Sequence, residues 1–196
     1  MNNKIIYIVI GLLVLAAAGF FLWKDWTNPL SEQEEQQEET TFNTFVNNDN
    51  EFELQIPSTW MEVVAPEGIR VLLSNIGEEQ IDSEREKEGF RSYLAVTYDV
   101  LDEKTMDEFV DYVEGVLESS LPSIEFATAT SMTIDTREAR AVEALVTQDG
   151  YEFKTLLVII KGDDGDVWTL SFNTAEIRWN HTKDLFYQMA ESFKLK

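Results

Sequence analysis

Three features of this sequence could carry chemistry: one histidine, a short run of aspartates and a general excess of carboxylates. The only histidine, His181, lies in the stretch RWNHTKD, and a Ser-His-Asp triad would have to use it. A general base needs a nucleophile to activate, and no serine of this sequence lies in a glycine-flanked elbow. We therefore expect a surface histidine at the start of a helix, and the sequence suggests no catalytic residue.

The run of aspartates lies in the stretch KGDDGDVW. Asp163, Asp164 and Asp166 offer oxygen ligands of the kind that calcium prefers, but the remaining ligands of an EF-hand loop, including its last glutamate, are missing. Turns between strands are commonly rich in aspartate and glycine for backbone reasons alone. We expect a hairpin turn without metal or cofactor, and calcium binding is the alternative.

The carboxylate excess is large, because 37 acidic residues against 15 basic ones give a net charge of −22. A surface of this sign repels phosphate backbones, so the composition argues against a nucleic-acid partner. There is no cysteine, which excludes disulfides, thiolate nucleophiles and cysteine metal sites. A glycosidase-like pair of carboxylates is permitted, but so many acids produce pairs by chance.

Six acids lie within the stretch GEEQIDSEREKEGF, residues 77–90. Such a stretch is by default a solvated loop, and its alternative role is the docking of a protein partner. The candidate partner-binding residues are Glu78, Glu79, Asp82, Glu84, Glu86 and Glu88.

The first residues predict a membrane anchor. From Ile5 to Trp23 no residue is charged, and at 1.5 Å per residue a helix of this length spans about 28 Å, close to the bilayer core. A signal peptide cleaved after Ala18 is the alternative, although apolar residues continue beyond that position. Lys4 precedes the span and acids follow it, which favours a cytoplasmic N-terminus and a single-pass protein of the cell membrane with an extracytoplasmic domain.

These patterns divide the chain into a transmembrane anchor at 1–26, an acidic linker at 27–41 and a globular domain at 42–196. Within the domain the hydrophobic period alternates between that of strands and that of helices. Thr105 and Glu108 form a capping-box pattern at the start of a helix that Pro122 ends, and a second helix is expected within 175–193. Strands are expected at 52–57, 69–74, 92–100, 125–134, 138–147, 151–160 and 167–172.

Short turns between the later strands predict an antiparallel meander, and the dipeptide Asp149-Gly150 is a strong hairpin signal. The stretch TLLVII, residues 155–160, is apolar on both faces, so its strand should be central and covered on both sides. In FELQIPSTW, Pro57 should end a strand because proline has no N–H for the ladder. Trp60 should then fold back over the open end of the sheet.

The stretch FELQIPSTW, and the ending DVWTLSFNTAEI followed by LFYQMAESFKL, resemble PsbP-like domains over most of residues 42–196. The resemblance implies an α+β fold, in which an antiparallel sheet is covered by helices in an α/β/α sandwich. Proteins that share this sandwich include a Ran-binding nuclear-transport protein and bacterial membrane-anchored proteins. After the predicted transmembrane helix, we therefore expect a domain that is not an enzyme and that docks a protein partner. An exported carboxylate-dependent hydrolase and a small-ligand-binding domain with an apolar pocket are the alternatives.

Overall fold

The computed structural model describes residues 40–78, 90–148 and 150–196. The predicted anchor, including Ile5 and Trp23, lies outside the described residues, as does the linker up to residue 39. Among the helices of the described ranges, none is long and apolar enough to cross a membrane.

The described chain is mostly β-structure with two α-helices. The first half contains β1 (Phe42–Val46), β2 (Phe52–Pro57), β3 (Trp60–Val63), β4 (Val71–Asn75), β5 (Tyr93–Val100) and α3 (Met106–Ser120). The second half contains β6 (Ile124–Phe126), β7 (Thr130–Ile134), β8 (Arg137–Gln148), β9 (Tyr151–Lys161), β10 (Asp166–Ala175), the 3-10 helix η1 (Glu176–Arg178), α4 (Trp179–Glu191) and β11 (Lys194–Leu195).

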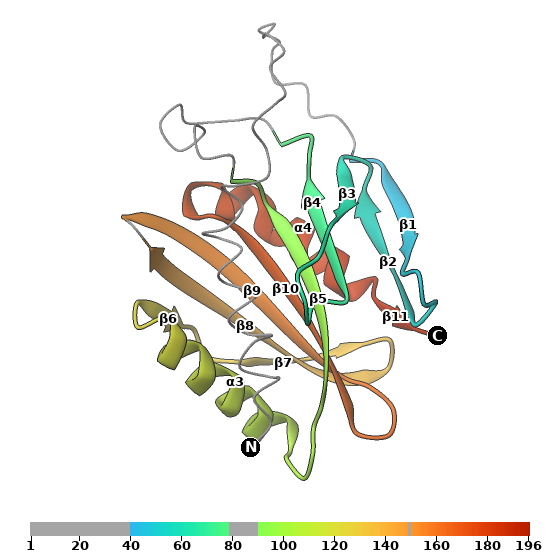
Figure 1. Ribbon diagram of the computed structural model, residues 1–196, viewed down its shortest axis with the longest axis vertical. Helices are drawn as coiled ribbons and strands as arrows, with labels where there is room; N and C mark the ends of the chain where they lie inside the picture. Colours follow the sequence, from blue (N-terminus) through green and yellow to red (C-terminus); the bar gives the residue numbers. More distant parts are fainter. Residues whose placement is uncertain (1–39, 79–89, 149) are drawn as a thin grey trace, which may run out of the picture.

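Two sheets share these strands, and all strand pairings within the described ranges are antiparallel. The large sheet has eight strands in the order β3-β4-β5-β10-β9-β8-β6, with β7 also paired to β8. The small sheet has the order β1-β2-β11 and lies at one side of the molecule (Figure 1). The expected antiparallel meander is confirmed, whereas the sequence did not reveal the second sheet.

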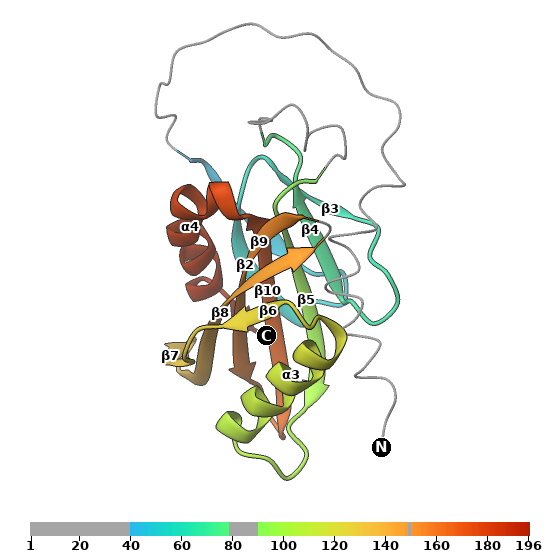
Figure 2. The same ribbon diagram turned by 90° about the vertical axis from the view of Figure 1, so that its left-hand side faces the viewer.

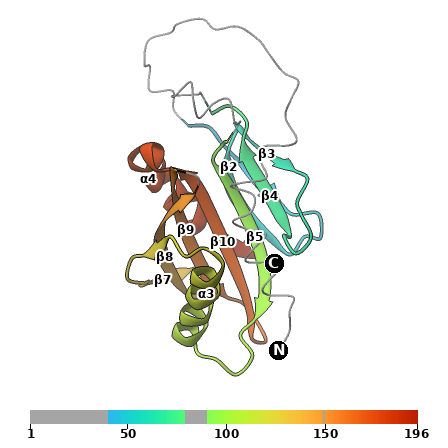
Figure 3. The same ribbon diagram turned by 60° about the vertical axis from the view of Figure 1, so that its left-hand side comes forward.

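Strand β9 is central in the large sheet, as its two-sided apolar pattern predicted. Leu156, Val158 and Ile160 point into a core that also contains residues of α4 and β2. Leu157 and Ile159 point into a second core, which contains the apolar residues of α3. The two helices therefore cover opposite faces of the large sheet, as Figures 2 and 3 show.

Local sequence signals determine how both helices form. The capping box at α3 is confirmed: Thr105 Oγ1 accepts a bond from the Glu108 amide, and the Glu108 carboxylate accepts one from the Thr105 amide. Helix α4 lies within the predicted range and follows one turn of 3-10 helix. Phe186 and Met189 of α4 are fully buried, as is Phe193 just beyond its end, so these apolar residues attach the C-terminal helix to the sheet.

Pro57 is the last residue of β2, at a position where its missing backbone N–H breaks no hydrogen bond of the sheet. The side of β2 away from β1 is paired with β11 only at Phe52 and Glu53. Further along that side, the Gln55 amide donates instead to Ser192 Oγ at 2.8 Å. Pro57 follows on the same side, so the small sheet loses no ladder bond there.

Trp60 is buried as expected, but its predicted place was wrong. It does not cover the end of the strand that precedes it, because Ser58 and Thr59 turn the chain and Trp60 begins β3 in the large sheet. Its indole packs edge-on against Phe186 of α4, with ring centroids 6.1 Å apart. The proline and the tryptophan therefore mark the two sides of a corner between sheets.

The predicted strand at 125–134 is divided into β6 and β7, which both pair with β8. Phe126 pairs with Ala144, and an unbroken register would pair Thr130 with Arg140. Thr130 instead pairs with Ala141, so one extra residue is accommodated between the two strands. The alternation of apolar and polar residues continues both before and after such an extra residue. The sequence pattern therefore predicted one continuous strand.

Substitutions of Trp60 test its packing against α4. Trp60 is 3% exposed, and its indole N–H makes no hydrogen bond within the described ranges. Trp60→Ala should therefore lower the free energy of unfolding by about 3–5 kcal/mol, because a large cavity opens against α4. Trp60→Phe should cost much less, since it retains a ring and loses no hydrogen bond. Urea denaturation followed by circular dichroism measures both, and equal losses would contradict this packing.

Candidate functional site

The acidic turn between β9 and β10 was the predicted alternative calcium site. Asp163 accepts two hydrogen bonds from the Arg137 guanidinium, at 2.9 and 3.0 Å. These bonds lower the pKa of the Asp163 carboxyl below its ordinary value. The pair joins the β9–β10 turn to the first residue of β8, so Asp163 has a structural partner of opposite charge.

The other two aspartates of the turn have different surroundings. Asp166 accepts a hydrogen bond of 2.7 Å from the Tyr98 hydroxyl, which raises the pKa of that phenol. Asp164 has a φ of 54°, a left-handed conformation, and Gly165 follows with a φ of 86°. No group of three or more potential metal ligands occurs in the part of the chain that the structure describes.

Of the predicted partner-binding residues, only Glu78 is described. Its carboxylate accepts a hydrogen bond from the Ser92 amide at 2.7 Å and lies 2.8 Å from Arg178. Only 6% of the Glu78 side chain is exposed, so it connects Ser92, next to β5, with η1 and is not presented to a partner. Glu79, Asp82, Glu84, Glu86 and Glu88 lie outside the described residues, and their docking role stays a prediction.

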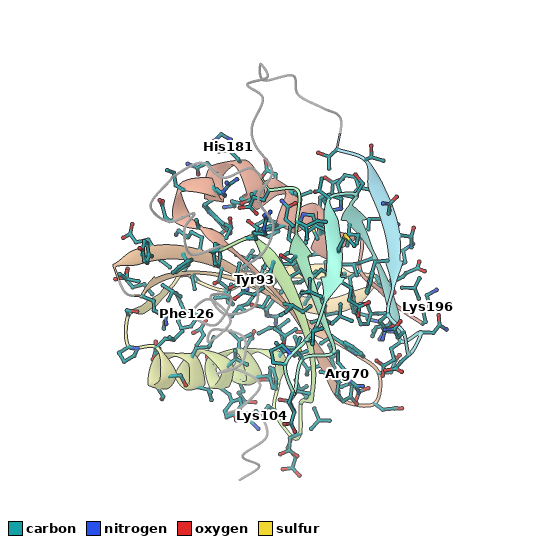
Figure 4. The ribbon with its side chains drawn as sticks, turned by 45° about the horizontal axis from the view of Figure 1, so that its top comes forward. Arg70, Tyr93, Lys104, Phe126, His181 and Lys196 are labelled. Carbon is teal, nitrogen blue, oxygen red and sulfur yellow. The ribbon has the colours of Figure 1, made fainter. Side chains whose placement is uncertain are left out.

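His181 lies in the first turn of α4 and is exposed, as the sequence predicted. Figure 4 shows it at the outer side of α4, away from Tyr93 in the middle of the large sheet.

One carboxylate lies within a cluster of polar side chains where α4 crosses β8. Lys183 Nζ is 2.7 Å from Glu143 Oε1, and the Tyr187 hydroxyl donates to the same oxygen at 3.1 Å. Burial, with Glu143 nearby, raises the pKa of Tyr187 to about 12. The phenol therefore keeps its proton at neutral pH and cannot act as a base there. These contacts join the helix to the sheet.

A strip of polar side chains on β10 was missed at the sequence level. The Thr155 hydroxyl donates to Asn173 Oδ1 at 2.7 Å, and Asn173 Nδ2 donates to the Ser171 side-chain and backbone oxygens, both at 3.1 Å. All three residues are buried. Ser171 therefore faces an amide, which cannot remove a proton, so the strip does not resemble an activated nucleophile. The alternation of Thr169, Ser171 and Asn173 with Trp168, Leu170 and Phe172 was the signal that could have identified it.

The outer side of α3 has three acids that form no salt bridge within the described ranges. Asp111, Glu114 and Glu118 recur at helical spacing, and the helix contains no basic residue. Burial and the two neighbouring acids raise the pKa of the Glu114 carboxyl, in that order. Asp107, one turn earlier, differs from them because it pairs with Arg140 at 2.7 Å. The three acids form a surface that would favour a cationic partner.

Comparison with known proteins agrees with this architecture. The PsbP family model matches residues 40–195, and the chain belongs to the PsbP family. No curated protein sequence gives a significant match.

Solved structures with this fold come from different organisms. Cyanobacterial PsbP (CyanoP) from Synechocystis is 18% identical with a TM-score of 0.59, covering 84% of this chain and 98% of its own. LpqN of Mycobacterium tuberculosis, which is involved in cell envelope biogenesis, is 10% identical with a TM-score of 0.60, covering 81% and 92%. The Ran-binding protein Mog1p of Saccharomyces cerevisiae is 12% identical with a TM-score of 0.56, covering 80% and 96%. At these identities the likeness concerns the fold.

The contacts of the acidic turn give a prediction about calcium. We expect millimolar calcium to leave the melting temperature unchanged, because Asp163 and Asp166 are hydrogen-bonded to Arg137 and Tyr98. A site of micromolar affinity would instead stabilise the fold by about 4 kcal/mol at thousandfold excess. Thermal melts with and without calcium measure this. A rise that disappears in the Asp163→Asn/Asp166→Asn variant would establish a calcium site.

Proposed function

We propose that this protein is a membrane-anchored accessory protein whose extracytoplasmic PsbP domain docks a basic protein partner and catalyses no reaction. This proposal depends mainly on one observation, the distribution of charge in the described domain. Arg137, Arg140 and Lys183 each lie against a carboxylate of the fold, whereas the acids on the outer side of α3 have no such partner among the described residues.

One observation and one prediction further support a binding role. LpqN and Mog1p are described as a cell-envelope protein and a Ran-binding protein, so domains of this fold occur in proteins of both kinds. The predicted anchor would hold the domain close to the bilayer, where a partner in the same membrane has a high effective concentration and weak docking suffices.

The anchor requires that the N-terminal segment is retained. Intact-mass analysis of the membrane fraction should therefore detect a chain that still contains residues 5–23, because the uncharged run is long enough for a bilayer. Added protease should digest the domain from the extracytoplasmic side only. A mature chain beginning at Gly19 would show that the segment is a cleaved signal peptide.

Docking through acids predicts a specific cross-link that weakens with salt. Cross-linking in native membranes, followed by mass spectrometry, should identify a basic protein as the partner. The yield of the cross-linked product should fall as ionic strength rises. Neutralising the docking acids should reduce the yield several-fold. Two triple variants separate the candidate surfaces: Asp111→Asn/Glu114→Gln/Glu118→Gln on α3, and Glu84→Gln/Glu86→Gln/Glu88→Gln in the acidic stretch.

The matched control neutralises three exposed acids elsewhere, as Glu62→Gln/Glu67→Gln/Glu103→Gln. An equal loss in the control would mean that only total charge matters, which contradicts a defined docking surface. The hydrolase alternative would be established by turnover of an ester, peptide, glycoside or phosphate that one carboxylate substitution abolishes.

A further inference from the structure

Among the described residues, strand β1 leaves one edge of the small sheet without a neighbouring strand. In the order β1-β2-β11 it is an end strand, and within the described ranges it pairs only with β2. Figure 1 shows it along the outer side of the molecule. An open edge of this kind presents unpaired N–H and C=O groups to other chains.

The hydrogen bonds of β1 show which residues present those groups. The Ser58 amide donates to the Thr41 carbonyl, and the Asn47 amide donates to the Phe52 carbonyl. Antiparallel bonding alternates along a strand, so the odd-numbered residues of β1 bond to β2. Phe42, Thr44 and Val46 therefore direct their backbone groups outward.

The composition of this edge does not protect it from pairing. Natural sheets usually blunt an open edge with lysine, proline or other interruptions. The strand FNTFV has no charged residue and no proline, and Val46 remains 40% exposed. By contrast, β3 at the end of the large sheet is short, contains Glu62 and is followed by Pro66.

We propose that β1 pairs antiparallel with β1 of a second copy of this chain, about a two-fold axis at Thr44. The small sheets of the two copies then form one continuous sheet. In this register Thr44 lies opposite Thr44, and Phe42 lies opposite Val46. Threonine pairs and aromatic–β-branched pairs are among the favourable cross-strand neighbours.

A second copy fits this edge because the strand pairs favourably with itself in the antiparallel direction. The residues whose backbone groups point outward are Phe42, Thr44 and Val46, and reversing their order places Phe opposite Val and Thr opposite Thr. The negative charge of each copy opposes association, so pairing should be weak in dilute solution and should strengthen when salt screens the repulsion. A basic partner at the acids of α3 would show the opposite salt dependence. This inference rests on the proposed anchor only for the high local density of copies.

Charge substitution on the two-fold axis tests the register. The full chain, labelled with donor and acceptor dyes, is reconstituted in phosphatidylcholine vesicles and energy transfer between copies is measured. Thr44→Lys and Thr44→Glu should each weaken pairing roughly fivefold or more, because equal charges then lie directly opposite. Mixing the two variants should restore pairing, because opposite charges then meet. Thr44 is exposed and loses only a hydrogen bond from Gln55, so the fold should tolerate both changes.

Thr133→Lys is the matched control, since Thr133 is an exposed threonine of β7, which like β1 has no charged residue. It should leave energy transfer unchanged. Failure of the mixture to recover, an equal loss in the control, or weakening by salt would overturn the proposal. If the chain does not remain with the vesicles, the anchor is refuted, and the same mixing pattern is then expected at high concentration in solution.

Discussion

The two-sided hydrophobicity of β9 is the constraint on which the rest of this structure depends. From Leu156 to Ile160 every side chain is buried, and successive side chains of a strand point to opposite faces. A sheet with such a strand at its centre must therefore be covered twice. Helix α3 covers one face, and α4 with the small sheet covers the other, so the layered order of the PsbP fold follows from one apolar stretch.

Charge has two separate roles in this molecule. Carboxylates that contact arginine or lysine connect elements distant in sequence: Asp163 of the β9–β10 turn pairs with Arg137 of β8, and Glu143 of β8 pairs with Lys183 of α4. The acids on the outer side of α3 connect nothing among the described residues and remain available to a cation-bearing surface. Net charge alone would not separate these roles, because only the local surroundings of each carboxylate show whether its charge is already compensated.

The two proposed surfaces would be compatible in one assembly. The edge of β1 belongs to the small sheet, whereas helix α3 covers the opposite face of the large sheet (Figure 2). Pairing through β1 would therefore present two acidic surfaces within one membrane-held pair. Their opposite dependence on salt follows from physical chemistry, since screening weakens attraction between unlike charges and repulsion between like charges.

The sequence by itself determined the elements whose signals are local. The Thr105–Glu108 cap, the apolar stripe of α4 and the central place of β9 were all predictable, because each depends on side chains a few residues apart. Only the tertiary structure decided that Trp60 begins a strand of the large sheet, that the strand after α3 is divided, and that Glu78 is buried against Arg178. These features depend on contacts between residues far apart in the chain, and the periodicity of a sequence carries no information about which distant partner meets a given side chain.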